Sequence, residues 1–139
     1  MLTHRFLLTL GSNDTSADHI SKSCEALRRL PGMRDLLFST PRRSLPVSFG
    51  LSDALFTDVV VLGATTLVKE EFSQVLKSLE HKAGRTAEQR RLHPEIIPID
   101  IDLILWEEQV LKPKDLERSY LITGLQELGI SDWRSLVRE

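Results

Sequence analysis

Apolar and polar positions follow two periods along this chain, one typical of strands and one typical of helices. A short apolar run, FLLTL over residues 6–10, predicts a β-strand that ends at Gly-Ser-Asn. Apolar side chains then recur every three or four residues over about residues 15–30, which predicts a helix, and a Pro-Gly pair ends it. The apolar stripe of this helix consists of Ala17, Ile20, Cys24, Leu27 and Leu30.

The middle of the chain repeats both signals. A strand is predicted over 36–40, a loop rich in Pro, Gly and Ser over 41–53, and a further strand over 56–64. The clearest helix covers 67–83, with acidic residues in its first turns and Gly84 just beyond its C-terminal end. Its apolar stripe consists of Val68, Phe72, Val75, Leu76, Leu79 and Ala83.

The last third of the chain predicts one more strand and a helical tail. An arginine-rich polar loop over 85–96 leads into a strand over 97–106. A helical turn near 113–118, a helix near 119–128 and a short helix after Ser131 follow. The element order is β-α-β-β-α-β with a helical C-terminal tail. This order is typical of the ferredoxin-like α+β fold, in which an antiparallel sheet carries two helices on one face.

The strand predicted over 97–106, IPIDIDLILW, has two carboxylates inside an otherwise apolar run. Side chains alternate between the two faces of a strand. One face then holds Pro98, Asp100, Asp102, Ile104 and Trp106. The other holds Ile97, Ile99, Ile101, Leu103 and Leu105 and is expected to cover the core under the helices. The acidic face is therefore expected to be the open face of the sheet.

Two acids at this spacing repel each other and are costly to bury unless positive charge lies between them. A divalent cation meets that need, and oxygen-only ligands favour magnesium over zinc. The D-x-D pattern alone favours the alternative, a solvated face whose acids pair with basic residues on neighbouring strands. Magnesium held by two carboxylates usually also binds substrate phosphates. Arg85, Arg90 and Arg91 before the strand and Arg118 after it make a phosphate site reasonable.

Composition narrows the function classes. The 139 residues are 41% hydrophobic and 27% charged, which indicates one globular domain over residues 1–139. With 18 basic and 20 acidic residues, the net charge of -2 does not favour a nucleic-acid or membrane partner. No apolar run approaches the roughly 20 residues of a membrane span, and the N-terminal run is too short for a signal peptide. The single cysteine excludes an internal disulfide, and we expect a cytoplasmic monomer.

Six short motifs, in chain order, resemble the 6-hydroxymethyl-7,8-dihydropterin pyrophosphokinase family. Members of this family transfer a pyrophosphoryl group from ATP to a pterin alcohol in folate biosynthesis. The resemblance runs from about Phe6 to Leu128. Its motifs are LGSN (10–13), RRSLPVS (42–48), LFTDVVV (55–61), EHKAGR (80–85), IDIDLILW (99–106) and RSYLITGL (118–125).

The resemblance implies roles for individual residues. Asp100 and Asp102 would bind two magnesium ions that bridge the phosphates of ATP, and Arg85 and Arg118 would complete the catalytic group. The nucleotide site would consist of Glu80, Arg90, Arg91, Lys114 and Arg118. The pterin site would consist of Ser44, Leu45, Val47, Phe56, Asp58 and Tyr120. Two of these, Phe56 and Tyr120, would stack on the flat ring, although aromatic side chains at such positions are also typical of core packing.

Three positions depart from the family pattern. The arginine that grips ATP shortly before the two aspartates is absent from residues 96–98, and a Pro-His pair is replaced by Pro113-Lys114. Asp58 stands where the family has Asn, and an ionised Asp offers acceptors only. The departures leave open a non-catalytic relative that binds a nucleotide or pterin as a regulatory or assembly protein. An RNA-binding module of the same topology is disfavoured because its open face would be basic and aromatic rather than acidic.

Overall fold

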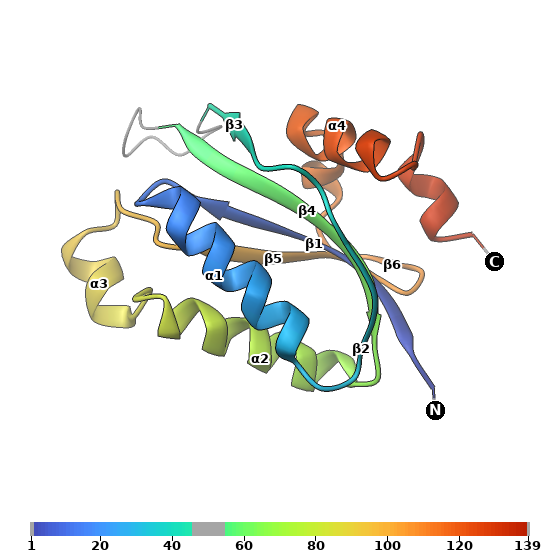
Figure 1. Ribbon diagram of the computed structural model, residues 1–139, viewed down its shortest axis with the longest axis horizontal. Coiled ribbons are helices and arrows are strands. Elements are labelled where there is room, and N and C mark those ends of the chain that lie inside the picture. Colours follow the sequence, from blue (N-terminus) through green and yellow to red (C-terminus); the bar gives the residue numbers. More distant parts are fainter. Residues whose placement is uncertain (1, 46–54, 139) are drawn as a thin grey trace.

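The computed structural model describes residues 2–45 and 55–138, which form one antiparallel sheet with helices on both faces (Figure 1). Its strands are β1 (His4–Ser12), β2 (Met33–Phe38), β3 (Arg42–Ser44), β4 (Phe56–Thr65), β5 (Asp100–Trp106) and β6 (Gln109–Val110). They lie in the order β2-β4-β1-β5-β6, and β3 pairs with the first residues of β4. Each β-α-β unit is thus split by an antiparallel strand, as the ferredoxin-like order predicted.

The predicted helices are confirmed. Helices α1 (Ser16–Arg29) and α2 (Lys69–Lys82) cover one face of the sheet, and α4 (Ser119–Glu127) lies on the other (Figure 1). Two 3-10 turns, η1 (Pro113–Glu117) and η2 (Trp133–Leu136), flank α4 in the tail. None of the described helices is long and apolar enough to span a bilayer.

Two short elements fall inside segments predicted as loops. The six-residue helix α3 (Ala87–Leu92) has no buried residue, so no apolar period reveals it. Its first turn is stabilised by the Thr86 side chain, which accepts the backbone N–H of Gln89 at 3.1 Å. The three-residue strand β3 is equally polar and is held by its pairing with β4.

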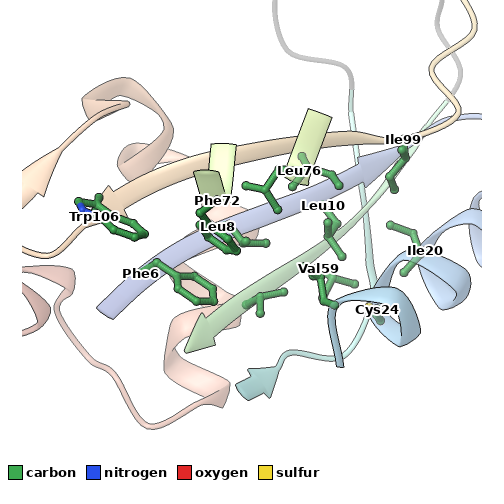
Figure 2. Close-up of a cluster of buried hydrophobic side chains, with 13 residues drawn as sticks. Phe6, Leu8, Leu10, Ile20, Cys24, Val59, Phe72, Leu76, Ile99 and Trp106 are labelled. Carbon is green, nitrogen blue, oxygen red and sulfur yellow. The ribbon is translucent and has the colours of Figure 1, made fainter. Parts of the chain in front are cut away.

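The core under α1 and α2 is aromatic at one end and aliphatic at the other (Figure 2). The ring centroid of Phe72 lies 4.7 Å from that of Phe6 and 5.9 Å from that of Trp106. Cys24 is buried in this core, as predicted, and burial raises the pKa of its thiol to about 11. The thiol therefore stays protonated and acts as a small apolar side chain.

The placement of Trp106 corrects the predicted faces of β5. Leu7 of β1 lies opposite Leu105, whereas the next residue of β1 lies opposite Leu103, so Ile104 is one residue too many. Such a β-bulge interrupts the alternation of side chains along a strand. Beyond it Leu105 turns toward α4 and Trp106 turns into the core under α1 and α2. The predicted faces hold from Ile99 to Leu103.

The face expected to be open is covered along most of its length. A second core, formed by Leu7, Val60, Ile104, Leu105, Leu116, Leu121 and Leu125, lies between the sheet and α4. Gly124 permits this close approach, because a Cβ there would lie 2.5 Å from Cγ2 of Val60. Trp133, in the tail of the chain, packs at the edge of this core. The end of this face that carries the two aspartates is accessible, with side-chain exposures of 39% for Asp100 and 29% for Asp102.

Candidate active site

Four adjacent strands place a row of residues side by side at the accessible end of the sheet. Gly11 of β1 lies opposite Asp58 of β4 on one side and opposite Asp100 of β5 on the other. Arg42 of β3 lies opposite Asp58 in turn. Directly opposed residues of antiparallel strands point to the same face. Because Gly11 has no side chain, space remains between the two carboxylates, and a Cβ there would lie 3.0 Å from Oδ1 of Asp58.

The two aspartates of β5 lie close enough together for the charge of one to affect the other. Burial, followed by the negative charge of Asp100, raises the pKa of the Asp102 carboxyl to about 6. The pair fits magnesium, which commonly takes one or two protein carboxylates and completes its shell with water and phosphate oxygens. Among residues 2–45 and 55–138 no group of three or more His, Cys, Asp or Glu side chains could hold a metal ion. A metal ion at this pair would complete its shell with water and phosphate oxygens.

Each aspartate contacts one basic side chain. Arg85 Nη1 lies 2.6 Å from Oδ1 of Asp100, and Lys112 Nζ lies 3.1 Å from Oδ1 of Asp102. The acids therefore have basic partners, as the alternative interpretation of the D-x-D pattern expected. Neither partner belongs to a strand: Arg85 follows α2 and Lys112 follows β6. The positive charges come from two connections that border the accessible end of the sheet.

Glu80 joins the end of α2 to the acidic strand. Its Oε2 accepts the backbone N–H of Ile101 at 2.8 Å and lies 3.5 Å from Nη1 of Arg85. Burial is the main reason that the pKa of Glu80 is raised, and the backbone hydrogen bond opposes it. Glu80 thus anchors the strand and the arginine together.

Asn13, which the sequence patterns did not single out as a site residue, fixes the segment that leads into β5. Its Oδ1 accepts the backbone N–H of Ile97 at 2.7 Å, and its Nδ2 donates to the carbonyl of Glu95 at 2.9 Å. The backbone N–H of Asn13 also donates to the carbonyl of Ile97 at 3.1 Å. The family pattern has an arginine in this segment. This chain has Ile97 there instead, and its side chain is buried. The only sequence signal for Asn13 was its place in the LGSN motif.

The buried Asp58 and the partly buried Ser44 form a polar pair beside Gly11. The Ser44 hydroxyl donates a short hydrogen bond to Oδ2 of Asp58. Burial raises the pKa of the Asp58 carboxyl to about 6, against the effect of the Ser44 hydrogen bond, and the charge of Asp100 adds to the rise. The carboxyl therefore gains a proton more readily than an exposed aspartate does.

The other residues assigned to the pterin site lie nearby where the structure describes them. Phe56 lies opposite Ser44 in the β3–β4 pairing. Tyr120, in the first turn of α4, has a raised pKa because of burial and the charge of Asp58. The exposed side chain of Leu45 and the ring of Tyr120 line one groove of about 620 Å³ between β3 and α4. Val47 lies outside the described residues.

The remaining predicted nucleotide-site residues are more dispersed. Arg118 lines the same groove, and its Nε lies 3.6 Å from Oδ1 of Asp115. Arg90 is exposed on α3, close enough for its charge to lower the pKa of Glu80. Arg91 and Lys114 are exposed, and neither contacts the acidic pair. Arg85 and Glu80 thus lie at the acidic strand and Arg90 lies near Glu80, whereas Arg91 and Lys114 do not contact the acids.

An acidic pair flanked by an arginine and a lysine, beside the Asp58–Ser44 pair, provides the kinds of groups that proteins transferring phosphate groups from a nucleotide use. The chain belongs to the 7,8-dihydro-6-hydroxymethylpterin-pyrophosphokinase (HPPK) family, whose model matches residues 7–129. This match confirms the family predicted from the six motifs. Membership implies pterin pyrophosphokinase activity in folate biosynthesis, with ATP and a pterin as substrates. A search of curated proteins gave no match.

Proposed function

We propose that this chain itself transfers the pyrophosphoryl group of ATP to 6-hydroxymethyl-7,8-dihydropterin, with Asp100 and Asp102 as the ligands of two magnesium ions. The observation that carries the proposal is the pair of half-buried carboxylates on one strand, at the accessible end of the sheet. Bound magnesium would neutralise the triphosphate and make its β-phosphorus more electrophilic. The other site residues would position the two substrates and add positive charge around the phosphates.

The pterin would bind across the row formed by Asp58, Gly11 and Asp100. The buried Asp58 carboxylate can accept hydrogen bonds from the amino and ring N–H groups of the pterin, and the Ser44 hydroxyl holds this carboxylate in place. Gly11 leaves room for the ring beside the carboxylate. Phe56 and Tyr120 would stack on its faces, and Leu45 and Val47 would belong to the loop that closes the ring edge.

The arginines would position the triphosphate for attack. Arg85, 2.6 Å from Asp100, is placed to contact phosphate once the carboxylate has taken a metal ion. Glu80 would hold Arg85 and β5 in fixed positions relative to each other. Positive charge around the nucleotide would come from Arg90, Arg91, Lys114 and Arg118.

The pterin oxygen then forms a bond to the β-phosphorus as the bond from that phosphorus to the α-β bridging oxygen breaks. The hydroxyl proton passes to solvent water, and AMP departs with the bridging oxygen. Alignment of the hydroxyl with the phosphorus contributes most of the rate, since such a reaction needs little covalent participation by the protein. We propose that the monomer is the active unit.

A second candidate is a relative that binds nucleotide or pterin without turnover. The observation that favours it is the buried Ile97 in the segment where the family pattern has an ATP-gripping arginine. The pairing of both acids with Arg85 and Lys112 also suits a site that never takes up metal.

AMP release from ATP and magnesium, with and without the pterin alcohol, separates the two candidates. The product is identified by mass spectrometry as the pterin diphosphate, and Asp58→Asn is run beside the parent. We expect AMP only when the pterin is present, and we expect Asp58→Asn, which restores the family's residue, to stay active. Pterin or nucleotide binding without AMP would reject the proposal in favour of the second candidate.

A further inference from the structure

Lys112 occupies a position that the transfer reaction as described does not use. Its ammonium lies 3.1 Å from Oδ1 of Asp102 and donates a hydrogen bond to that oxygen. Asp102 is one of the two carboxylates assigned to metal binding, so a cation belonging to the chain already sits at one end of the pair. Arg85 does the same at the Asp100 end.

The position of Lys112 is set by the β5–β6 hairpin. The backbone N–H groups of Leu111 and Lys112 both donate to the carbonyl of Ile104, at 2.8 and 3.3 Å. Ile104 is two residues beyond Asp102 on the same strand, so the lysine backbone is tied to the strand that it serves. Pro113 starts η1 directly after it and restricts the backbone further.

The two cations differ in how freely they can leave. The Arg85 side chain is 15% exposed and is also held by Glu80, whereas the Lys112 side chain is 49% exposed. An ammonium on a flexible, half-exposed stem can move into water or onto a phosphate at small cost. The Lys112 ammonium can therefore leave Asp102, whereas the Arg85 guanidinium is held beside Asp100.

We propose that Lys112 is a resident cation that competes with one divalent metal ion for Asp102 and thereby makes metal binding depend on the nucleotide. The inference rests on the proposed function. One carboxylate oxygen cannot bind an ammonium and a metal ion at full strength, so the lysine weakens metal binding to the protein alone. When a nucleotide is bound, its phosphates give the ammonium another anionic partner, and the competition at Asp102 ends.

Manganese binding to the full chain, counted by electron paramagnetic resonance, tests this directly. Without nucleotide, Lys112→Met is expected to bind Mn2+ about fivefold more tightly than the parent, the effect of releasing one half-exposed ion pair. A non-hydrolysable ATP analogue should raise Mn2+ affinity by a larger factor in the parent than in Lys112→Met. Lys77→Met, at an exposed lysine of α2 to which the proposed site assigns no role, should behave as the parent does.

Thermal unfolding provides a second readout, in which the extra stability gained on adding Mn2+ separates a lysine that competes with the metal from a purely structural one. In EDTA, Lys112→Met should unfold at a lower temperature than the parent, because Asp102 then has no cation. In Mn2+ it should gain more stability than the parent gains. Lys112→Gln serves in its place if the methionine variant does not fold.

Equal or weaker Mn2+ binding in Lys112→Met would overturn the inference. If the parent releases AMP in a metal-dependent way and the variant's Mn2+ affinity is unchanged, only the role of Lys112 fails. If the parent binds no Mn2+ even with the analogue and releases no AMP, the proposed function and this inference fail together.

Discussion

The carboxylate of Glu80 accepts the backbone N–H of Ile101 across 2.8 Å and so joins the end of α2 to the acidic strand. Strand β6 pairs only with Leu105 and Trp106 at the far end of β5. At Ile101 the Glu80 side chain therefore provides the acceptor that a neighbouring strand would otherwise provide. Glu80 also lies 3.5 Å from Arg85. One buried carboxylate therefore fixes both the strand that carries the aspartates and the arginine that faces them.

Replacing Glu80 should affect stability according to whether an acceptor remains. Glu80→Ala leaves the Ile101 N–H without its partner and should lower the free energy of unfolding by about 1–3 kcal/mol. Glu80→Gln keeps a carbonyl acceptor and should cost less than about 1 kcal/mol. Urea unfolding of both variants measures this difference. Equal losses in the two would show that the hydrogen bond to Ile101 is not what Glu80 contributes.

Asn13 should control the order of the segment before β5. Asn13→Ala removes both side-chain bonds to residues 95–97, whereas Asn13→Asp keeps an acceptor for the Ile97 N–H and loses the donor to Glu95. Hydrogen exchange at the Ile97 amide should accelerate strongly in the alanine variant and much less in the aspartate variant. An Ile97 amide that exchanges equally slowly in all three proteins would show that the Asn13 side chain does not order this segment.

Gly11→Ala should weaken pterin binding while leaving the fold intact. The added Cβ would lie 3.0 Å from Oδ1 of Asp58 and 3.8 Å from Cδ2 of Phe56, inside the space assigned to the ring. Alanine is otherwise more favourable than glycine in a strand by roughly 0.5–1 kcal/mol, so stability should change little. A fluorescence titration should show pterin affinity reduced on the order of tenfold, as expected for lost contacts worth about 1.4 kcal/mol. ATP affinity in the same variant is the control and should match the parent.

The buried Asp58 carboxyl should make stability depend on pH. Its pKa is raised from 3.8 to about 6 in the folded protein, so the folded state binds more protons than the unfolded state between these values. Its favourable contribution is fully present below about pH 4, falls as the pH rises through about 6, and is absent above.

The matched variant for this effect is Asp58→Asn, which cannot ionise. Urea unfolding in EDTA at several pH values between about 4 and 8 should show the variant gaining about 1–3 kcal/mol on the parent as the pH rises. Asp102, whose pKa is also raised to about 6, contributes the same sign of slope in both proteins and so cancels in the comparison. A difference between the two that is independent of pH would mean that Asp58 is not titrating in this range.

Local periodicity was sufficient for the main elements but not for their details. The predicted strand-helix order holds because each long element repeats its apolar stripe several times. Trp106 was placed on the wrong face because a single inserted residue at Ile104 reverses the alternation, and nothing in a short apolar run marks a bulge. Helix α3 escaped prediction because it buries no side chain.

Charge and motif spacing in the sequence predicted the acidic pair of the site but not the contacts between separate elements. Two acids at i and i+2 on a strand share a face regardless of the surrounding fold. The row of Asp58, Gly11 and Asp100 depends on the pairing register of three strands, which the sequence does not specify residue by residue. The contacts of Glu80, Asn13 and Lys112 depend on side-chain bonds between separate elements, which leave no periodic signal.

The central claim is that Asp100 and Asp102 form a metal-dependent catalytic strand, and single-turnover AMP formation in Asp100→Asn and Asp102→Asn tests it most directly. Each variant should lose more than about a hundredfold in rate at saturating magnesium. Glu25→Gln, an exposed acid on α1, should keep the parent rate. In EDTA, Asp102→Asn should unfold at the same temperature as the parent or a higher one, since the repulsion within the pair is relieved. AMP formation at near the parent rate in either aspartate variant would contradict the account.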